Sequence, residues 1–248
     1  MYFWKCWRDS RGRFVINLML VSAICALVII MEAKFGGPAS YQMSKPASGV
    51  ENMWATVGRM VLGGLVSLVI LFGALTFGAG SIGEEFKEQT LGFLFTRPRR
   101  RRFLVWTCWL VGACELLVVI FLGVVVIFGG LTYLSGRVYT WRLLTAVVPL
   151  LVGALAVYTM TYFMTAVARS SEKGISFGLG ILMIDLLLPV AAYFWHRQLT
   201  SIWDFMRTGC AWAAGSARAF PVEQFIIYAA LTMGFVLGAQ LVLERMEV

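Results

Sequence analysis

Residues 81–102, SIGEEFKEQTLGFLFTRPRRRR, form a charged insert between two long apolar runs. The insert begins with acidic residues and ends with a run of arginines, whereas the chain on both sides of it is suited to lipid. Charged side chains are costly to bury in hydrocarbon, so the insert must lie outside a membrane that the two runs cross. Its position suggests a docking surface for a soluble partner.

Composition places the whole chain in the same class. Of its 248 residues 60% are hydrophobic and 14% are charged, and the mean hydropathy is +0.81. Soluble domains contain about 45–50% apolar residues, so a soluble fold of this length could not bury so much apolar surface. The net charge of +8 would suit nucleic acid. The apolar background indicates instead that the basic residues flank membrane helices, and no nucleic-acid partner is expected.

The number of membrane spans follows from the apolar runs. A helical span needs about 20 such residues. Six segments meet this requirement: 14–31, 55–80, 103–128, 143–168, 175–195 and 222–243. The predicted fold class is therefore an all-α integral membrane protein, with a single transmembrane domain over residues 1–248.

Lysine and arginine counts predict the orientation of these spans. Six spans leave both termini on one side, and that side, which includes the insert, carries 13 basic residues against 8 on the other. The positive-inside rule then places both termini and the insert in the cytoplasm. We expect a multi-pass protein of a bacterial or archaeal cell (inner) membrane.

Two segments outside the spans have helical character. Residues 1–13 mix aromatic and basic side chains, which is typical of an amphipathic helix in the membrane interface, although flanking charge alone would also explain them. Residues 196–221 contain several aromatic residues but are too polar and short to span. A helical external hairpin between spans 5 and 6 fits this segment.

The chain lacks the motifs of several enzyme classes. It has no Gly-rich loop ending in Gly-Lys-Ser/Thr, no His-Glu-x-x-His, no Gly-x-Ser-x-Gly and no Cys/His cluster. We therefore expect no catalytic residue, no metal site and no cofactor in this chain. The five cysteines make no disulfide framework. Cys108 and Cys114, which fall in the third span, are expected to be inert core thiols.

Two acids, Glu115 and Asp185, fall deep inside predicted spans. Each costs roughly 2.5–3.5 kcal/mol at a helix centre, so both should face the bundle interior, a partner subunit or a wet cavity. One interpretation is a translocation path or a proton-coupled gate. The other is a structural hydrogen bond to a neighbouring helix, with Tyr158–Tyr162 as the expected donors.

The insert resembles the signature region of type-2 ABC exporter permeases. That region commonly reads Glu, four residues, Thr-Leu, a Leu pair, Pro and Arg. The matching positions here are Glu85, Thr90, Leu91, Leu94, Pro98 and Arg101. Gln89 departs from the pattern, because the family usually has Gly before the Thr. The layout of interfacial helix, six spans and external hairpin is also similar to that family.

The resemblance implies a membrane subunit that pairs with a second copy or a paralogue and binds two ATPase subunits, which bind the ATP. The segment after span 2 would be a coupling helix: acidic residues contact the ATPase, a hydrophobic stretch anchors at the membrane edge, and the Pro-Arg end binds membrane lipid phosphates. The implied ATPase-coupling residues are Glu84, Glu85, Glu88, Thr90, Leu91, Pro98 and Arg101. The transported substrate is not specified, and export as the direction comes from the resemblance.

Two other functions compete with this one. An ion- or proton-coupled secondary transporter would use Glu115 and Asp185 as its ion-binding groups. Residues 1–128 and 129–248 show no clear inverted repeat, which counts against it. A membrane scaffold without transport activity would need no ATPase partner.

Overall fold

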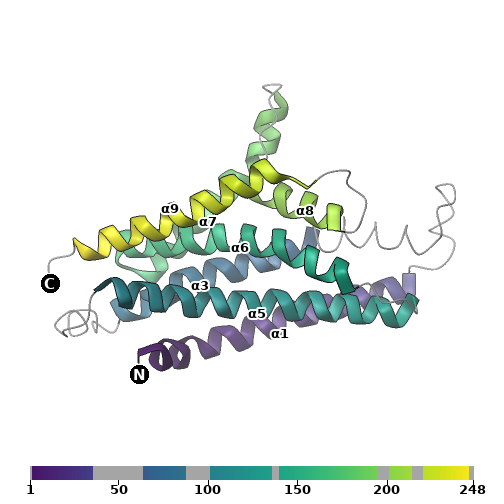
Figure 1. Cartoon of the computed structure of the whole chain (residues 1–248), viewed down its shortest axis with the longest axis horizontal. Coiled ribbons are helices and arrows are strands. Elements are labelled where there is room, and N and C mark those ends of the chain that lie inside the picture. The colour runs from purple at the N-terminus through teal and green to yellow at the C-terminus, as the bar shows by residue number, and fades with distance from the viewer. Residues whose placement is uncertain are drawn as a thin grey trace.

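The protein is all-helical throughout the part that the computed structural model describes, residues 2–35, 64–87, 101–135, 140–194, 201–213 and 220–245. This confirms the predicted all-α class. These residues form seven helices and no strand (Figure 1). The helices are α1 (Tyr2–Phe35), α3 (Ser67–Lys87), α5 (Arg101–Ser135), α6 (Thr140–Ala168), α7 (Ser171–Phe194), α8 (Ile202–Ala213) and α9 (Val222–Glu244).

Five of the described helices are long and apolar enough to cross a membrane, as expected of a multi-pass membrane protein. Their candidate spans are Phe3–Ile30, Gly64–Glu84, Val105–Gly130, Thr145–Ala168 and Val222–Glu244. The predicted fifth span corresponds to α7, which is not among them. Its stretch from 171 to 188 carries Glu172, Lys173 and Asp185, and Figure 1 shows its last part turning away from the other helices.

Helix α6 is the centre of the bundle. It packs against α3, α5, α7, α8 and α9. Tyr158 and Tyr162 are fully buried on it, and both reach α5. Tyr158 Oη donates to the Trp109 carbonyl oxygen at 2.9 Å, and Tyr162 Oη donates to that of Val105 at 3.2 Å. These bonds remove the cost of burying two phenol groups away from water.

Threonines on α6 satisfy their hydroxyls within their own helix. Thr159, Thr161 and Thr165 are fully buried, and each donates to the carbonyl oxygen four residues earlier, at 2.8–2.9 Å. A helix can therefore carry polar side chains through the apolar interior without a partner on another helix.

The contacts fix the relative directions of the helices. Ser10 lies at Glu115 and Val21 lies at Gly123, so α1 and α5 run the same way. Asn17 contacts Thr76, whereas Arg13, four residues earlier, contacts Glu84, so α3 runs opposite to α1. The start of α1 and the end of α9 lie at the same end of the bundle (Figure 1).

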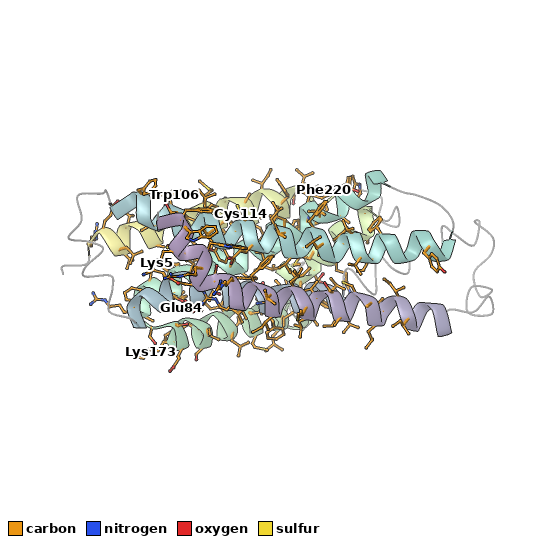
Figure 2. The ribbon with its side chains drawn as sticks, turned by 90° about the horizontal axis from the view of Figure 1, so that it is seen from below. Lys5, Glu84, Trp106, Cys114, Lys173 and Phe220 are labelled. Carbon is orange, nitrogen blue, oxygen red and sulfur yellow. The ribbon has the colours of Figure 1, made fainter. Side chains whose placement is uncertain are left out.

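The first residues of the chain belong to α1. The described part of the predicted interfacial segment 1–13, residues 2–13, continues without a break into the first apolar helix. Figure 2 shows the first turns of α1 running at an angle to the rest of this helix. These turns pack on α5, where Ser10 is buried and donates a hydrogen bond to Glu115. Their placement in the membrane interface stays a prediction.

Glycines allow the closest helix contacts. A Cβ at Gly78 would lie 2.5 Å from the Tyr158 carbonyl oxygen, so α3 meets the backbone of α6 there. Gly174 and Gly178 lie against Thr165 and Thr161 in the same manner. The Gly-x-x-x-Gly spacing on α7 therefore serves packing within the chain.

We expect Gly78→Ala to destabilise the bundle. The added methyl would force α3 away from α6, and overpacking of this kind costs about 1–3 kcal/mol. The melting temperature of the detergent-solubilised protein measures the effect. Gly180→Ala is the matched control, because a Cβ at Gly180 meets nothing within 4 Å. Equal melting temperatures for the two variants would contradict the close approach of α3 and α6.

Candidate functional site

The acidic start of the insert is helical and continues α3. Residues 81–87 extend the apolar helix without a break, so no change of structure marks the predicted boundary at residue 80. Glu84 and Glu85 both lie in this last part of α3, and Arg101 is the first residue of α5. Of the remaining predicted coupling residues, Glu88, Thr90, Leu91 and Pro98 lie outside the described residues.

Glu84 forms an ion pair with Arg13 of α1. Arg13 Nη1 donates to Glu84 Oε1 at 2.5 Å, and both side chains are partly shielded from solvent. The guanidinium lies over Gly80, where a Cβ would be 2.0 Å from Nη1. Gly80 therefore leaves the space through which Arg13 reaches the end of α3. The ion pair joins the start of the predicted coupling segment to the first helix of the chain.

A second polar contact joins the same two helices one turn further along. Asn17 Nδ2 donates to Thr76 Oγ1 at 3.2 Å and to the Arg13 carbonyl oxygen at 2.9 Å. Gly73 again allows the approach, since its Cβ would lie 3.0 Å from Asn17 Oδ1. Interhelical hydrogen bonds of this kind are worth about 0.6 kcal/mol on average in membrane bundles.

Glu115 of α5 completes this group of polar residues. Ser10 Oγ donates to Glu115 Oε1. The carboxyl is only 2% exposed, and its Oε2 has no hydrogen-bond partner among the described residues. We call the group the polar seam. It consists of Ser10, Arg13 and Asn17 of α1, Thr76 and Glu84 of α3, and Glu115 of α5.

Asp185, a residue of α7, contacts a different part of the structure, the N-terminus of α8. The backbone N–H of Ile202 donates to Asp185 Oδ2 at 2.9 Å, and that of Asp204 donates to Ser201 Oγ at 3.0 Å. The first turn of a helix has unsatisfied N–H groups and a partial positive charge, so a carboxylate stabilises it. The structural interpretation of Asp185 is therefore supported. The expected donor was wrong, because it is backbone of α8 and not a side chain of Tyr158–Tyr162.

Helix α8 is held against α6 through small residues. A Cβ at Gly209 would lie 2.3 Å from Pro149 Cβ, and one at Gly153 would lie 2.5 Å from Met206 Cγ. Phe205 and Cys210 of α8 are also buried. The described centre of the predicted external hairpin is thus a helix packed on the bundle.

The structure does not bring the two buried acids together. Glu115 contacts α1, whereas Asp185 contacts α8. Sequence reasoning missed Ser10, Arg13 and Asn17, although their spacing of three and four residues places them on one helix face. Within the described residues no three His, Cys, Asp or Glu side chains gather to hold a metal ion.

The polar seam predicts energetic coupling between Arg13 and Glu84. Arg13→Gln and Glu84→Gln should each lower the free energy of unfolding, because each leaves a shielded charge without its counterion. The double variant should lose less than the sum of the two, by about 1 kcal/mol. Thermal unfolding of the four proteins measures this. Arg8→Gln is the control, since Arg8 is exposed beside Asp9 at 3.7 Å. Strict additivity would contradict a direct ion pair.

The cap at Asp185 predicts a local effect on α8. Replacing an N-terminal capping side chain by Ala costs about 0.5–2 kcal/mol. In Asp185→Ala the amides of the first turn of α8 should therefore exchange hydrogen faster, by about two- to thirtyfold. Hydrogen exchange followed by mass spectrometry measures it. Glu172→Ala removes an exposed acid of the same helix α7 and should leave α8 unchanged. Unchanged exchange in both variants would show that Asp185 does not cap α8.

Comparison with known proteins places the chain in a family. No curated protein matches it. One family model, described as a protein of unknown function (DUF2705), matches residues 19–247. This match takes in all the described helices except the first half of α1. The chain therefore belongs to the family of proteins of unknown function DUF2705.

Proposed function

We propose that this protein is the membrane-spanning permease subunit of an ATP-driven ABC exporter. The observation that carries the proposal is the placement of the insert. Its acidic start continues α3, and its arginine end begins α5. Figure 2 shows Glu84 at the same end of the bundle as Lys5 of α1 and Lys173 of α7. The segment that resembles a coupling helix thus begins on a charged end of the bundle, where a soluble ATPase would have access to it.

The charge of this end supports a cytoplasmic location. The described residues there include Lys5, Arg8, Arg11, Lys173 and Arg245. Basic residues next to membrane helices favour the cytoplasmic side. The proposed topology has six spans, with α7 as the fifth, and both termini in the cytoplasm of a bacterial or archaeal cell. Such an arrangement leaves α8 on the external side.

The polar seam provides contacts through which a displacement of the coupling segment would reach other helices. Closure of two ATPase subunits on ATP would displace the coupling segment, which is continuous with α3. Arg13 ties the end of α3 to α1, and the contact at Gly78 presses α3 on the central helix α6. The displacement would therefore move three spans together and would not bend α3 alone.

The remaining parts of the proposal come from the resemblance. Glu85 and Glu88 are assigned to the ATPase contact together with Glu84, Thr90 and Leu91. Pro98 and Arg101 are assigned to the membrane edge, where arginines bind lipid phosphates. The subunit would act with a second copy or a paralogue and with two ATPase subunits. It would not hydrolyse ATP itself.

A secondary transporter receives less support. That function needs acids that can exchange an ion or proton along one path. Asp185 accepts a hydrogen bond from the backbone of α8, whereas Glu115 lies in the polar seam, where α5 contacts α1. Two acids in separate surroundings do not form a relay.

Charge reversal in the coupling segment tests the proposal. The chain is co-expressed with a candidate partner ATPase that carries a phosphate-binding loop. Glu85→Lys should abolish co-purification of that ATPase, because a lysine would repel the basic partner groups of an acidic docking residue. Glu85 is a better choice than Glu84, which also holds Arg13.

Glu172→Lys is the matched control for this experiment. It makes the same charge change on an exposed residue next to Lys173 at the same end of the bundle, and it should leave co-purification intact. Retention of the ATPase by both variants would overturn the assigned role of the insert. Loss of the ATPase from both variants would show that the added positive charge acts non-specifically. That result would also overturn the assigned role of the insert.

A further inference from the structure

Two cysteines from distant parts of the sequence lie in contact. Cys6 of α1 and Cys108 of α5 are 102 residues apart, yet their Sγ atoms are separated by 3.0 Å. Cys6 is half-buried, and Cys108 is 3% exposed. A disulfide has an S–S bond of about 2.05 Å, so a shift of about one ångström would bring the two sulfur atoms to bonding distance.

The polar seam holds this pair in register. Ser10 follows Cys6 by one helical turn, and Glu115 follows Cys108 by two turns. The hydrogen bond between Ser10 and Glu115 therefore fixes the two helices just beyond the thiols. Because α1 and α5 run in the same direction, the thiols stay opposite each other as long as this bond is present.

The other three cysteines are not placed to compete. Cys25 is fully buried and lies near Gly123, about five turns further along α1. Cys114 is exposed on α5, six residues beyond Cys108. Cys210 is buried in α8, where desolvation raises the pKa of its thiol to about 12. A thiol with a raised pKa is a poor source of the reactive thiolate.

We propose that Cys6 and Cys108 form a site of reversible oxidation by hydrogen peroxide. The Cys6 thiolate, on the more accessible sulfur, attacks one peroxide oxygen, and the O–O bond breaks to give a sulfenic acid and hydroxide. The Cys108 sulfur then attacks the sulfenic sulfur and expels hydroxide, which is released as water together with the thiol protons. The net change is two thiols and one peroxide to one disulfide and two waters, and an external thiol reverses it.

The disulfide would fasten the first turns of α1 to α5. It would close a covalent ring that contains all of α3 and the insert. The ring would hold the N-terminal part of α1 on the polar seam even if the Ser10–Glu115 hydrogen bond opened. This inference does not depend on the proposed transport function, and the thiol chemistry can be tested on the purified protein alone.

Counting free thiols tests the site. The full-length protein in detergent is treated with hydrogen peroxide, denatured, and labelled with a maleimide that adds a fixed mass to each free cysteine. The untreated chain should take up five labels, one for each cysteine. The treated chain should take up two fewer, and dithiothreitol should restore them. A digest under non-reducing conditions should contain a peptide that joins Cys6 to Cys108.

Single variants decide whether this pair is responsible. Cys6→Ser should keep all four remaining thiols after peroxide treatment. Cys108→Ser should lose only the Cys6 thiol, as a sulfenic acid that dithiothreitol restores, and should form no disulfide. Cys114→Ser is the matched control and should still lose two. Retention of five thiols in the treated wild-type protein would overturn the proposal. So would loss of two thiols in Cys6→Ser, or a disulfide that joins two copies of the chain.

Discussion

Polar groups inside this bundle cannot rely on water, and this constraint orders most of its structure. In hydrocarbon an unsatisfied donor or acceptor costs several kcal/mol, so a partner within the protein stabilises each polar group that has one. The threonines of α6 use their own backbone, and its tyrosines use carbonyl oxygens of α5. The first turn of α8 uses a carboxylate from α7. Each solution also fixes a contact between helices or removes the need for one.

The polar seam shows how such partners position larger elements. Apolar packing against α5 alone would allow α1 to slide, because lipid and leucine are similar surroundings. Ser10, Arg13 and Asn17 accept only a few relative positions, since each has a defined partner on α3 or α5. Gly73 and Gly80 provide the space for two of these side chains. The polar seam therefore fixes the position of α1 along α3 and α5, in addition to stabilising the bundle.

The sequence predicted the helices better than their partners. Hydropathy located the apolar helices because a span needs a long apolar run, and it failed at the end of α3, where the helix continues into charged residues up to Lys87. For Asp185 a structural and a transport interpretation both followed from the sequence. Its hydrogen-bond partner, the backbone N–H of Ile202, lies in the predicted hairpin, whose path local patterns do not determine. The pairing of Ser10 with Glu115 joins residues 105 positions apart. Only the packing of α1 on α5 brings them together.

The separation in sequence between these partners sets an order of events during synthesis of the chain. Asn17 and Arg13 enter the membrane with the first helix, and their partners follow 59 and 71 residues later, with α3. Ser10 can form its hydrogen bond only after residue 115 has been synthesised, whereas the partner of Asp185 follows it by only 17 residues. The newly inserted α1 therefore carries unsatisfied polar groups until α3 and then α5 arrive. Translation would complete the N-terminal half of the bundle in that order, with the central helix α6 added to a preformed group of three.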